Sequence, residues 1–461
     1  MPVQIEKLIK NERSEKITNV FQSIYKKKPD FFVRVPGRVN LIGEHIDYCG
    51  YGVCPMALDQ DIFLAVGTAG EGKKLRLHNV DRKFEDFECE LDDNIEISLE
   101  NGPPKWYQYF LCGIKGILET LPKDQLQNLP SICVVVSGTV PQSAGLSSSS
   151  ALVSAAALAA AHSLKLQLPK EELANLCARC ERYIGTQGGG MDQAIAFLAK
   201  EGCAKYIEFE PLRSTEVILP TGAVFVIAHS LTNLNKAATG DFNCRVVECR
   251  LAAQIIAHKN SLDWTKIKRL GDLQKLLGLN LDEMLALTGE CLKTTPYTKQ
   301  DIIQELNTTS SLVDTVSLTP NTRDIEKFKL YQRALHVFNE AKRVKQFYET
   351  CKNAAGGEDT LLTLGTLMSQ SHESLRDLYE CSHPQLDKLV EISKSFTLGT
   401  RLTGAGWGGC TVSLVAPENV QKFIDSIKEN FFKPLGVTEG FEFIVFTTTP
   451  KSGACIYVHN E

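Results

Sequence analysis

The stretch GTVPQSAGLSSSSALVSAAALAAA, residues 138–161, constrains the fold of this 461-residue chain more than any other. Glycines and four consecutive serines stand directly before a run of alanine and leucine, which are strong helix formers. The apolar stretch SICVVV, residues 131–136, comes just before it and has the pattern of a buried strand. The order predicts a strand, a polar loop and a helix whose small side chains allow close packing.

A loop of this composition suits an anion. The first amides of a helix have no partner within the helix, and the helix dipole adds positive potential at the same end. Small residues let the backbone approach a phosphate, and serine hydroxyls donate to its oxygens or bind Mg²⁺. The P-loop pattern does not fit, because no lysine follows Gly145. A helix N-cap with surplus serines remains the alternative, since serine is a preferred capping residue.

A second stretch, VPGRVNLIGEHIDY, gathers polar side chains within an otherwise apolar segment. Residues 31–35 and 39–42 have the pattern of extended pieces, and residues 36–37 that of a turn between them. The polar groups offer donors and acceptors to a polyhydroxylated ligand, and a surface turn with a salt bridge is the alternative. These polar residues are Arg38, Glu44, His45 and Asp47.

Two more segments combine glycine with possible ligand contacts. RLTGAGWGGCTVSLV, residues 401–415, has four glycines ahead of a strand pattern. This composition suits the close approach of a ligand, and a tight bulged hairpin would have the same pattern. In GGGMDQ, Asp192 stands beside flexible backbone and before an apolar helix, where an aspartate is often a cap.

Composition argues against several classes of partner. A net charge of −5 gives no reason to expect nucleic acid or an anionic membrane. The charged N-terminus lacks the apolar core of a signal peptide, and the longest apolar run is too short to span a bilayer. The fifteen cysteines are scattered, and the pair in CARC, Cys177 and Cys180, falls in a helical pattern without further metal ligands. We expect a cytoplasmic protein with reduced thiols and no nucleic-acid or membrane partner, and a monomer is the default assembly.

The order of segments predicts the fold class. Strand patterns alternate with helical ones without a regular βαβ repeat, which favours a two-lobed α+β fold. We expect one lobe at residues 1–218 and a second at residues 219–461, with a mostly helical insert at about 245–350.

Together these segments resemble the GHMP small-molecule kinases, and the galactokinase branch most closely. PGRVNLIGEHIDY is similar to the signature of that branch, and VPQSAGLSSSSALV is similar to the phosphate-loop motif of the superfamily. RLTGAGWGGCTVSLV matches the third motif, and CERYIGTQGGGMDQ matches the segment that carries the catalytic aspartate. The motifs follow the order of the family from near residue 30 to beyond residue 410, so the resemblance covers essentially the whole chain.

The resemblance implies a sugar 1-kinase that transfers the γ-phosphoryl group of ATP to an anomeric hydroxyl. It also implies an N-terminal α/β lobe with the serine-rich phosphate loop and a ferredoxin-like C-terminal lobe, with the active site between them. The residues implied to bind ATP, with Trp106 as a wall for adenine, are Trp106, Gly145, Leu146, Ser147, Ser148 and Ser149. Those implied to bind Mg²⁺ are Ser149 and Glu181. Those implied to bind the sugar are Arg38, Glu44, His45, Asp47, Gly190, Asp192 and Phe242.

Asp192 and Arg38 form the implied catalytic pair. A nearby arginine would make Asp192 a weak base. In a loose phosphoryl-transfer transition state the proton leaves late, so positioning and charge stabilisation carry most of the rate. We expect Asp192 to orient the hydroxyl and finally to accept its proton, and Arg38 to stabilise the developing charge.

The choice of sugar depends on one aromatic residue. Galactokinases usually carry a tyrosine in the segment that here is DFNCRVVECR, and Phe242 stands in its place. With HIDYCGY, this segment resembles the N-acetylgalactosamine kinase subgroup more closely. We expect N-acetylgalactosamine as the substrate, with galactose as the competing choice. A non-catalytic sensor of sugar and ATP is a further alternative, which the presence of all the implied catalytic residues disfavours.

Overall fold

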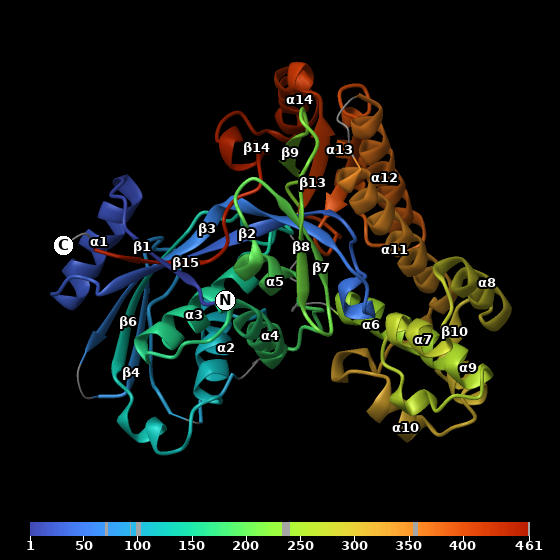
Figure 1. Ribbon diagram of the computed structural model, residues 1–461, viewed down its shortest axis with the longest axis horizontal. Coiled ribbons are helices and arrows are strands. Elements are labelled where there is room, and N and C mark those ends of the chain that lie inside the picture. The colour runs from blue at the N-terminus through green and yellow to red at the C-terminus, as the bar shows by residue number, and fades with distance from the viewer. Residues whose placement is uncertain (70–71, 93, 98–102, 233–239, 354–357, 460–461) are drawn as a thin grey trace.

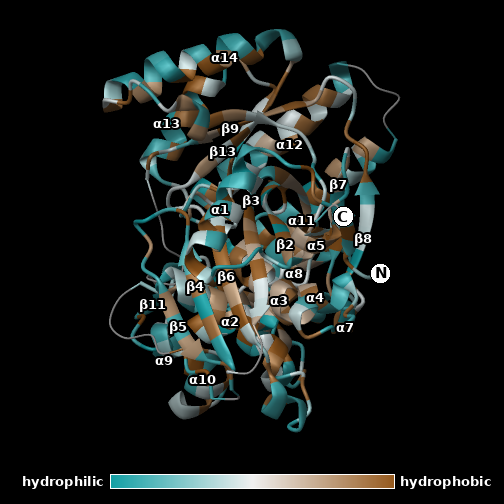
Figure 2. Ribbon diagram, turned by 90° about the vertical axis from the view of Figure 1, so that its left-hand side faces the viewer, coloured by the Kyte–Doolittle hydropathy of each residue, from teal (hydrophilic) through white to brown (hydrophobic). Residues whose placement is uncertain are grey.

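The computed structural model describes residues 1–69, 72–92, 94–97, 103–232, 240–353 and 358–459, and two large sheets organise these residues (Figure 1). The first sheet has seven strands in the order β1-β15-β2-β3-β6-β4-β5. The strands are β1 Gln4–Lys7, β2 Phe31–Ile42, β3 Cys54–Ala69, β4 Lys74–Asn79, β5 Phe87–Glu90, β6 Ser131–Gly138 and β15 Cys455–Val458. Figure 2 shows more hydrophobic colouring on β6, near the centre of this sheet, than on β4.

Helices cover both faces of the first sheet. Successive side chains of a strand point to opposite faces. Phe31 and Val33 of β2 therefore pack against one group of helices, and Phe32 packs against α1 on the other face. The helices are α1 Glu12–Tyr25 on one face, and α2 Trp106–Leu118, α3 Ser148–Ser163, α4 Lys170–Cys180 and α5 Met191–Leu198.

The alanine-rich helix α3 packs very closely against α2. A Cβ atom on Gly113 of α2 would lie 2.3 Å from the carbonyl oxygen of Val153. Only small residues on both helices permit this approach, as the sequence predicts. The helical prediction for Cys177 and Cys180 is also confirmed, because both lie in α4 as buried, free thiols.

The predicted turn at residues 36–37 is wrong. β2 runs without interruption from Phe31 to Ile42, and its pairing with β3 shifts register between Pro36 and Arg38. The glycine forms a bulge within one long strand, since both flanking apolar pieces pair with the same neighbour. A Cβ atom on Gly37 would lie 2.9 Å from the carbonyl oxygen of Leu146, so the bulge lets the serine-rich loop touch this strand.

The second sheet confirms the ferredoxin-like prediction. Its four antiparallel strands lie in the order β12-β13-β9-β14. Numbered along the chain, this order is 4-1-3-2 when read from β14, and helices connect β9 to β12 and β13 to β14, as in a ferredoxin-like βαββαβ unit. The elements are β9 Val224–His229, β12 Gly399–Thr403, β13 Cys410–Val415, α14 Val420–Ile427 and β14 Val445–Thr448.

The connection from β9 to β12 carries the mostly helical insert that the sequence predicts. The helices of the whole connection, which continues beyond the predicted insert at about 245–350, are α6 Asp241–Lys259, α7 Leu270–Leu277, α8 Leu281–Cys291, α9 Lys299–Glu305, α10 Ser310–Val316, α11 Leu330–Lys352, α12 Glu358–Asp377 and α13 Pro384–Ser393. Two short strands, β10 Tyr297–Thr298 and β11 Lys327–Phe328, pair within it. α11 and α12 pack along each other (Figure 1).

The lobe boundary near residue 218 stays a prediction. It follows the small hairpin of β7 Ala204–Glu208 and β8 Arg213–Val217. The last strand, β15, returns to the first sheet between β1 and β2. Among the described residues, no helix combines the length and the hydropathy needed to cross a bilayer.

Candidate active site

The serine loop, residues 138–147, leads from β6 into α3. Helix α3 begins at Ser148, and Ser147 before it has φ 67°, in the left-handed region. Ser147 has the position of an N-cap, but its side chain makes no capping hydrogen bond, and among the described atoms its buried hydroxyl finds no partner. The alternative interpretation, a helix N-cap with surplus serines, therefore lacks the side-chain hydrogen bond that defines a cap. The loop leaves the first amides of α3 without a capping side chain.

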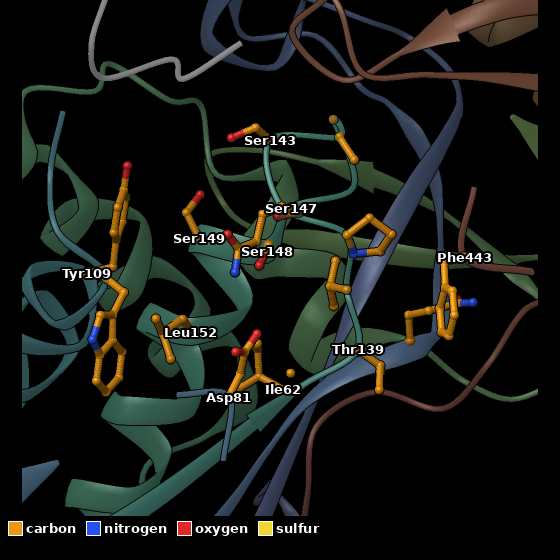
Figure 3. Close-up of a pocket in the computed structure, with 18 of the residues that line it drawn as sticks. Ile62, Asp81, Tyr109, Thr139, Ser143, Ser147, Ser148, Ser149, Leu152 and Phe443 are labelled. Atoms are coloured by element: carbon orange, nitrogen blue, oxygen red, sulfur yellow. The ribbon is translucent and has the colours of Figure 1, made fainter. Parts of the chain in front are cut away.

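A cavity of about 1350 Å³ opens at this helix start. Figure 3 shows the hydroxyl groups of Ser147, Ser148 and Ser149 at this cavity, with Tyr109 on one side and Phe443 on the other. Trp106, the predicted adenine wall, also lines it. The indole N–H of Trp106 donates to the carbonyl of Glu85 at 2.9 Å, which fixes the ring at the start of α2. A cavity of this volume is large enough for a nucleotide.

The third glycine stretch holds the serine loop in place. Residues 404–409 form the turn of the hairpin β12–β13. A Cβ atom on Gly404 would lie 2.5 Å from the carbonyl oxygen of Gly145, and one on Gly145 would lie 2.5 Å from that of Thr403. The glycines at this contact thus permit close approach between two backbones of the protein. Leu146 differs from the other residues predicted to bind ATP. Its side chain is buried in the core, and its carbonyl oxygen accepts from the Arg38 amide at 3.1 Å.

Arg38 and Asp192 meet beside the serine loop. The Nε and Nη2 atoms of Arg38 lie 2.8 Å and 2.7 Å from Oδ1 of Asp192, and Nη1 donates to the carbonyl of Gly145. The β-bulge aims Arg38 inward from β2, and the first turn of α5 presents Asp192. One buried guanidinium therefore ties the predicted catalytic carboxylate to the predicted phosphate loop. The sequence predicts that Arg38 lies close to Asp192, but it does not predict the contact with the loop.

Glu181 lies close to the same helix start. It opens the short 3-10 turn after α4, and Oε1 accepts from Ser149 Oγ at 3.3 Å. The sequence missed two partners of this carboxylate. Ser150 Oγ lies 2.8 Å from Glu181 Oε2 and 3.3 Å from Asp192 Oδ2, and the amide of Gln193 donates to Glu181. Four consecutive serines are more than a helix cap requires, and this excess is the signal that could have identified Ser150.

The oxygen donors at this point fit Mg²⁺. A hydroxyl and a carboxylate face each other at Ser149 and Glu181, and Mg²⁺ prefers such hard oxygen ligands together with substrate phosphates. Among the described residues, no cluster of three or more His, Cys, Asp or Glu side chains could hold a metal. A magnesium site here would thus depend on phosphate oxygens of a bound nucleotide.

The GEHIDY loop, residues 43–48, packs against the start of α5. Oδ2 of Asp47 accepts from the amide of Met191 at 3.3 Å. A Cβ atom on Gly189 would lie 2.3 Å from the amide nitrogen of Tyr48. Gly190, with φ 104°, then turns the chain into the helix that carries Asp192. The structure therefore brings Asp47 and Gly190 next to the predicted catalytic aspartate.

Two predicted sugar ligands are already engaged by the protein. Glu44 is buried, and its carboxylate accepts from Arg401 at 2.8 Å and from Asn40 at 3.2 Å. The ring nitrogens of His45 lie 2.7 Å from the Tyr48 hydroxyl and 2.8 Å from the Ala405 carbonyl. Direct sugar contacts from Glu44 and His45 stay predictions, and their observed contacts hold the loop itself. Arg401, which sequence reasoning missed, has no local signal.

A chain of hydroxyl groups supports His45. A carbonyl only accepts, so Nε2 of His45 donates to Ala405, and in the neutral ring Nδ1 accepts from Tyr48. The Tyr379 hydroxyl lies 2.7 Å from that of Tyr48. Burial, reinforced by the nearby Cys249 and Cys49 thiols, raises the pKa of Tyr48 well above its usual range, so this phenol stays a donor at neutral pH.

Phe242, the predicted sugar-selective residue, lies beside this chain. Its ring centroid is 5.7 Å from that of His45 and 5.6 Å from that of Tyr48. It packs with Val246, Ala405 and Trp407 in a small apolar cluster. The structure thus places an apolar surface, without a phenolic hydroxyl, next to the GEHIDY loop.

Three family models match the chain. The galactokinase galactose-binding signature matches residues 19–68, the N-terminal domain of GHMP kinases residues 109–200, and the C-terminal GHMP kinase model residues 358–433. A galactokinase from Dictyostelium discoideum is 40% identical, over 96% of this chain and 94% of the relative. The chain belongs to the galactokinase family of the GHMP kinases. It is accordingly an enzyme of the sugar phosphotransferase class, as the motifs predict.

Other relatives agree with this family. A Saccharomyces cerevisiae galactokinase is 34% identical over 97% of this chain and 95% of its own. The crystal structure of Lactococcus lactis galactokinase complexed with galactose has a TM-score of 0.74 at 25% identity, covering 96% of this chain and 99% of that one. Methanococcus jannaschii mevalonate kinase, at 18% identity and a TM-score of 0.55, shares the fold. These comparisons confirm the GHMP kinase fold, and they do not single out the N-acetylgalactosamine kinase subgroup.

Proposed function

We propose that this member of the galactokinase family transfers the γ-phosphoryl group of ATP to the anomeric hydroxyl of a galactose-configured sugar. One observation carries the proposal: Arg38 binds Asp192 and the carbonyl of Gly145 in the serine loop at once, and the GEHIDY loop contacts the start of the helix that carries Asp192. A phosphate held by the first loop and a sugar held by the second would come together at this pair.

The nucleotide would occupy the cavity at the start of α3. The amides and hydroxyls of Ser147, Ser148 and Ser149 would donate to its phosphates. Trp106, fixed by Glu85, would stack on the base. Ser149 and Glu181 would hold Mg²⁺, which supplies positive charge against the β- and γ-phosphates.

Asp192 would orient the sugar hydroxyl and accept its proton late in the transfer. Arg38 holds the carboxylate in one orientation by two contacts to Oδ1, and its charge would stabilise the negative charge that develops on the phosphoryl group. Asp47 and the backbone near Gly190 would bind the other sugar hydroxyls. Glu44 and His45, engaged by protein groups, would support that loop from behind.

Galactose is the sugar that the comparisons favour, since the relatives that match over most of the chain are galactokinases. This sugar was the alternative in the sequence prediction. N-acetylgalactosamine is the second candidate because of Phe242, whose apolar cluster with Val246 and Ala405 offers a surface to an acetamido methyl group. A pocket difference of this kind separates substrates by only one or two orders of magnitude.

A panel of hexoses tests the proposal. The protein is incubated with Mg-ATP and galactose, N-acetylgalactosamine, glucose or mannose, and NMR identifies the phosphorylated carbon. We expect a 1-phosphate from galactose or N-acetylgalactosamine, and the ratio of kcat/KM assigns the substrate. Phosphorylation at another carbon contradicts the proposal. Sugar and ATP binding without any ADP release would support the non-catalytic sensor.

The cytoplasmic location and the monomeric state stay predictions.

A further inference from the structure

We propose that Glu340, on helix α11 of the insert, is a positioning residue that holds the GEHIDY loop in its sugar-binding conformation. The inference rests on the proposed function, because it assigns the insert a task at that sugar site. Among the described residues, the hydrogen bonds of Glu340 go to Gly43, Ser371 and Arg343, which lie outside the serine loop and outside residues 404–409.

Glu340 reaches the loop through a single backbone amide. Its Oε1 accepts from the amide of Gly43 at 2.9 Å and from Ser371 Oγ at 2.7 Å. Its Oε2 accepts from Nε of Arg343 at 2.7 Å. Gly43 is the first residue of the loop and directly precedes Glu44, so this bond fixes where the loop begins.

A second contact from the same helix holds the next residue. His336 lies one helical turn before Glu340, and its Nε2 lies 3.1 Å from the carbonyl oxygen of Glu44. Because a carbonyl accepts, His336 donates there, and its Nδ1 accepts from Ser374 at 2.8 Å. Helix α11 thus binds one amide and one carbonyl of consecutive loop residues.

The loop needs such a hold because its backbone is strained. Gly43 has φ 104°, and His45, a residue with a Cβ atom, has φ 64°. Left-handed conformations of non-glycine residues cost free energy and persist where surrounding contacts over-determine them. The hydrogen bonds from Glu340 and His336 on α11 provide such constraints on the loop backbone.

The charge of Glu340 makes the hold strong. The side chain is fully buried. Burial alone would raise its pKa, but Arg343, His336 and Arg401 together outweigh burial and lower the pKa to about 2. An ionised carboxylate accepts stronger hydrogen bonds than a neutral amide, so Gly43 is bound by a charged acceptor at neutral pH.

A matched residue separates positioning from general stability. Glu248 on α6 is another buried glutamate, and it pairs with Arg245 and Arg333 at 3.0 Å and 2.8 Å. Among the described residues, its hydrogen-bond partners are Arg245, Arg333 and the amide of Lys329, which all lie outside the GEHIDY loop. Loss of its charge should therefore destabilise the insert without releasing the loop.

The experiment compares Glu340→Gln with Glu248→Gln in the full-length enzyme. Hydrogen exchange of the peptide covering residues 43–48 is measured first, without substrates. We expect faster exchange there in Glu340→Gln alone. We then expect the sugar KM to rise about tenfold in that variant, the equivalent of one hydrogen bond to a charged group, while kcat and the Kd of ATP change less than about twofold. Glu248→Gln should lower Tm and leave both sugar KM and loop exchange unchanged.

Glu340→Asp covers the case in which Glu340→Gln does not fold. This variant keeps the charge for Arg343 and withdraws the carboxylate from Gly43 by one methylene, so we expect the same pattern in smaller measure. Exchange and sugar KM equal to the wild type in the folded variants would overturn the inference. A wild-type protein that binds no sugar would instead contradict the proposed function, while the exchange data would still decide whether Glu340 holds the loop.

Discussion

The serine loop contacts Arg38, and the GEHIDY loop contacts the start of α5 beside Asp192, but different forces hold the two loops. The serine loop is held by backbone against backbone, where Gly145 and Gly404 approach too closely for any Cβ atom. The GEHIDY loop is held by buried charged side chains, with Arg401 on Glu44 and Glu340 on the Gly43 amide. The phosphate side should therefore fail through steric substitutions, and the sugar side through changes of charge.

We expect turnover to depend on the pair of Arg38 and Asp192 between the two loops. Asp192→Asn should therefore have the largest effect on kcat. Asparagine keeps the size of the side chain but cannot accept the proton of the sugar hydroxyl. We expect kcat to fall by at least about a thousandfold, the range typical of a lost catalytic group. Calorimetric ATP binding should remain, because Asp192 does not line the nucleotide cavity. A kcat within tenfold of the wild type would contradict the assigned role.

Gly404→Ala tests the steric side of the comparison. Gly404 has φ 83°, and an added Cβ atom would overlap the Gly145 carbonyl at 2.5 Å. We expect a loss of about 3 kcal/mol in the free energy of unfolding and weaker ATP binding. Gly436→Ala is the control, because Gly436 has the same φ of 83° with no atom within 4 Å, and strain alone should cost about 1 kcal/mol. Equal losses in the two variants would show that the loop contact adds nothing.

The same contrast explains what the sequence could predict. The serine loop could be predicted from the local sequence, because strand, loop and helix start are contiguous and the small residues indicate close packing. The contacts of the GEHIDY loop are remote: Glu340 is 297 residues from Gly43, and Arg401 is 357 residues from Glu44. No local pattern identifies such partners, so the sequence assigns to Glu44 only the sugar-binding role that its motif implies.

The predicted turn at residues 36–37 failed for a related reason. Pro36 and Gly37 are turn formers locally, but both flanking segments pair with β3, and this long-range pairing turns the glycine into a bulge. The return of β15 to the first sheet likewise depends on a partner far along the chain, Arg34 opposite Cys455. In contrast, the ferredoxin-like second sheet was predicted through the family resemblance and is confirmed.

Acid should weaken the sugar side through its buried titratable groups, His336 and Glu340. Burial lowers the pKa of His336 from 6.5 to about 4, against the attraction of Glu340. As pH falls from 6.5 to 4, the unfolded chain binds a proton that the folded protein does not, so the folded state loses about 3 kcal/mol. The lowered pKa of Glu340 extends the loss from pH 4.5 toward 2. Urea unfolding at pH 7, 5.5 and 4.5 measures this slope, and His336→Gln should flatten it between pH 6.5 and 4; a slope unchanged by that substitution would contradict the assignment.

Ser150→Ala should have the smallest effect and sharpens the comparison, because it tests a side-chain contact on the phosphate side. One hydroxyl proton serves both Glu181, at 2.8 Å, and Asp192, at 3.3 Å, so its loss loosens the two carboxylates without removing either. We expect a cost of about 1 kcal/mol, which is roughly a fivefold lower kcat, and a higher requirement for Mg²⁺. Ser163→Ala, at the far end of the same helix with a hydroxyl that lacks a partner among the described atoms, is the matched control. If both variants keep the wild-type kcat, Arg38 and Gln193 suffice to place Asp192 and Glu181, and the Ser150 hydroxyl adds nothing to their support.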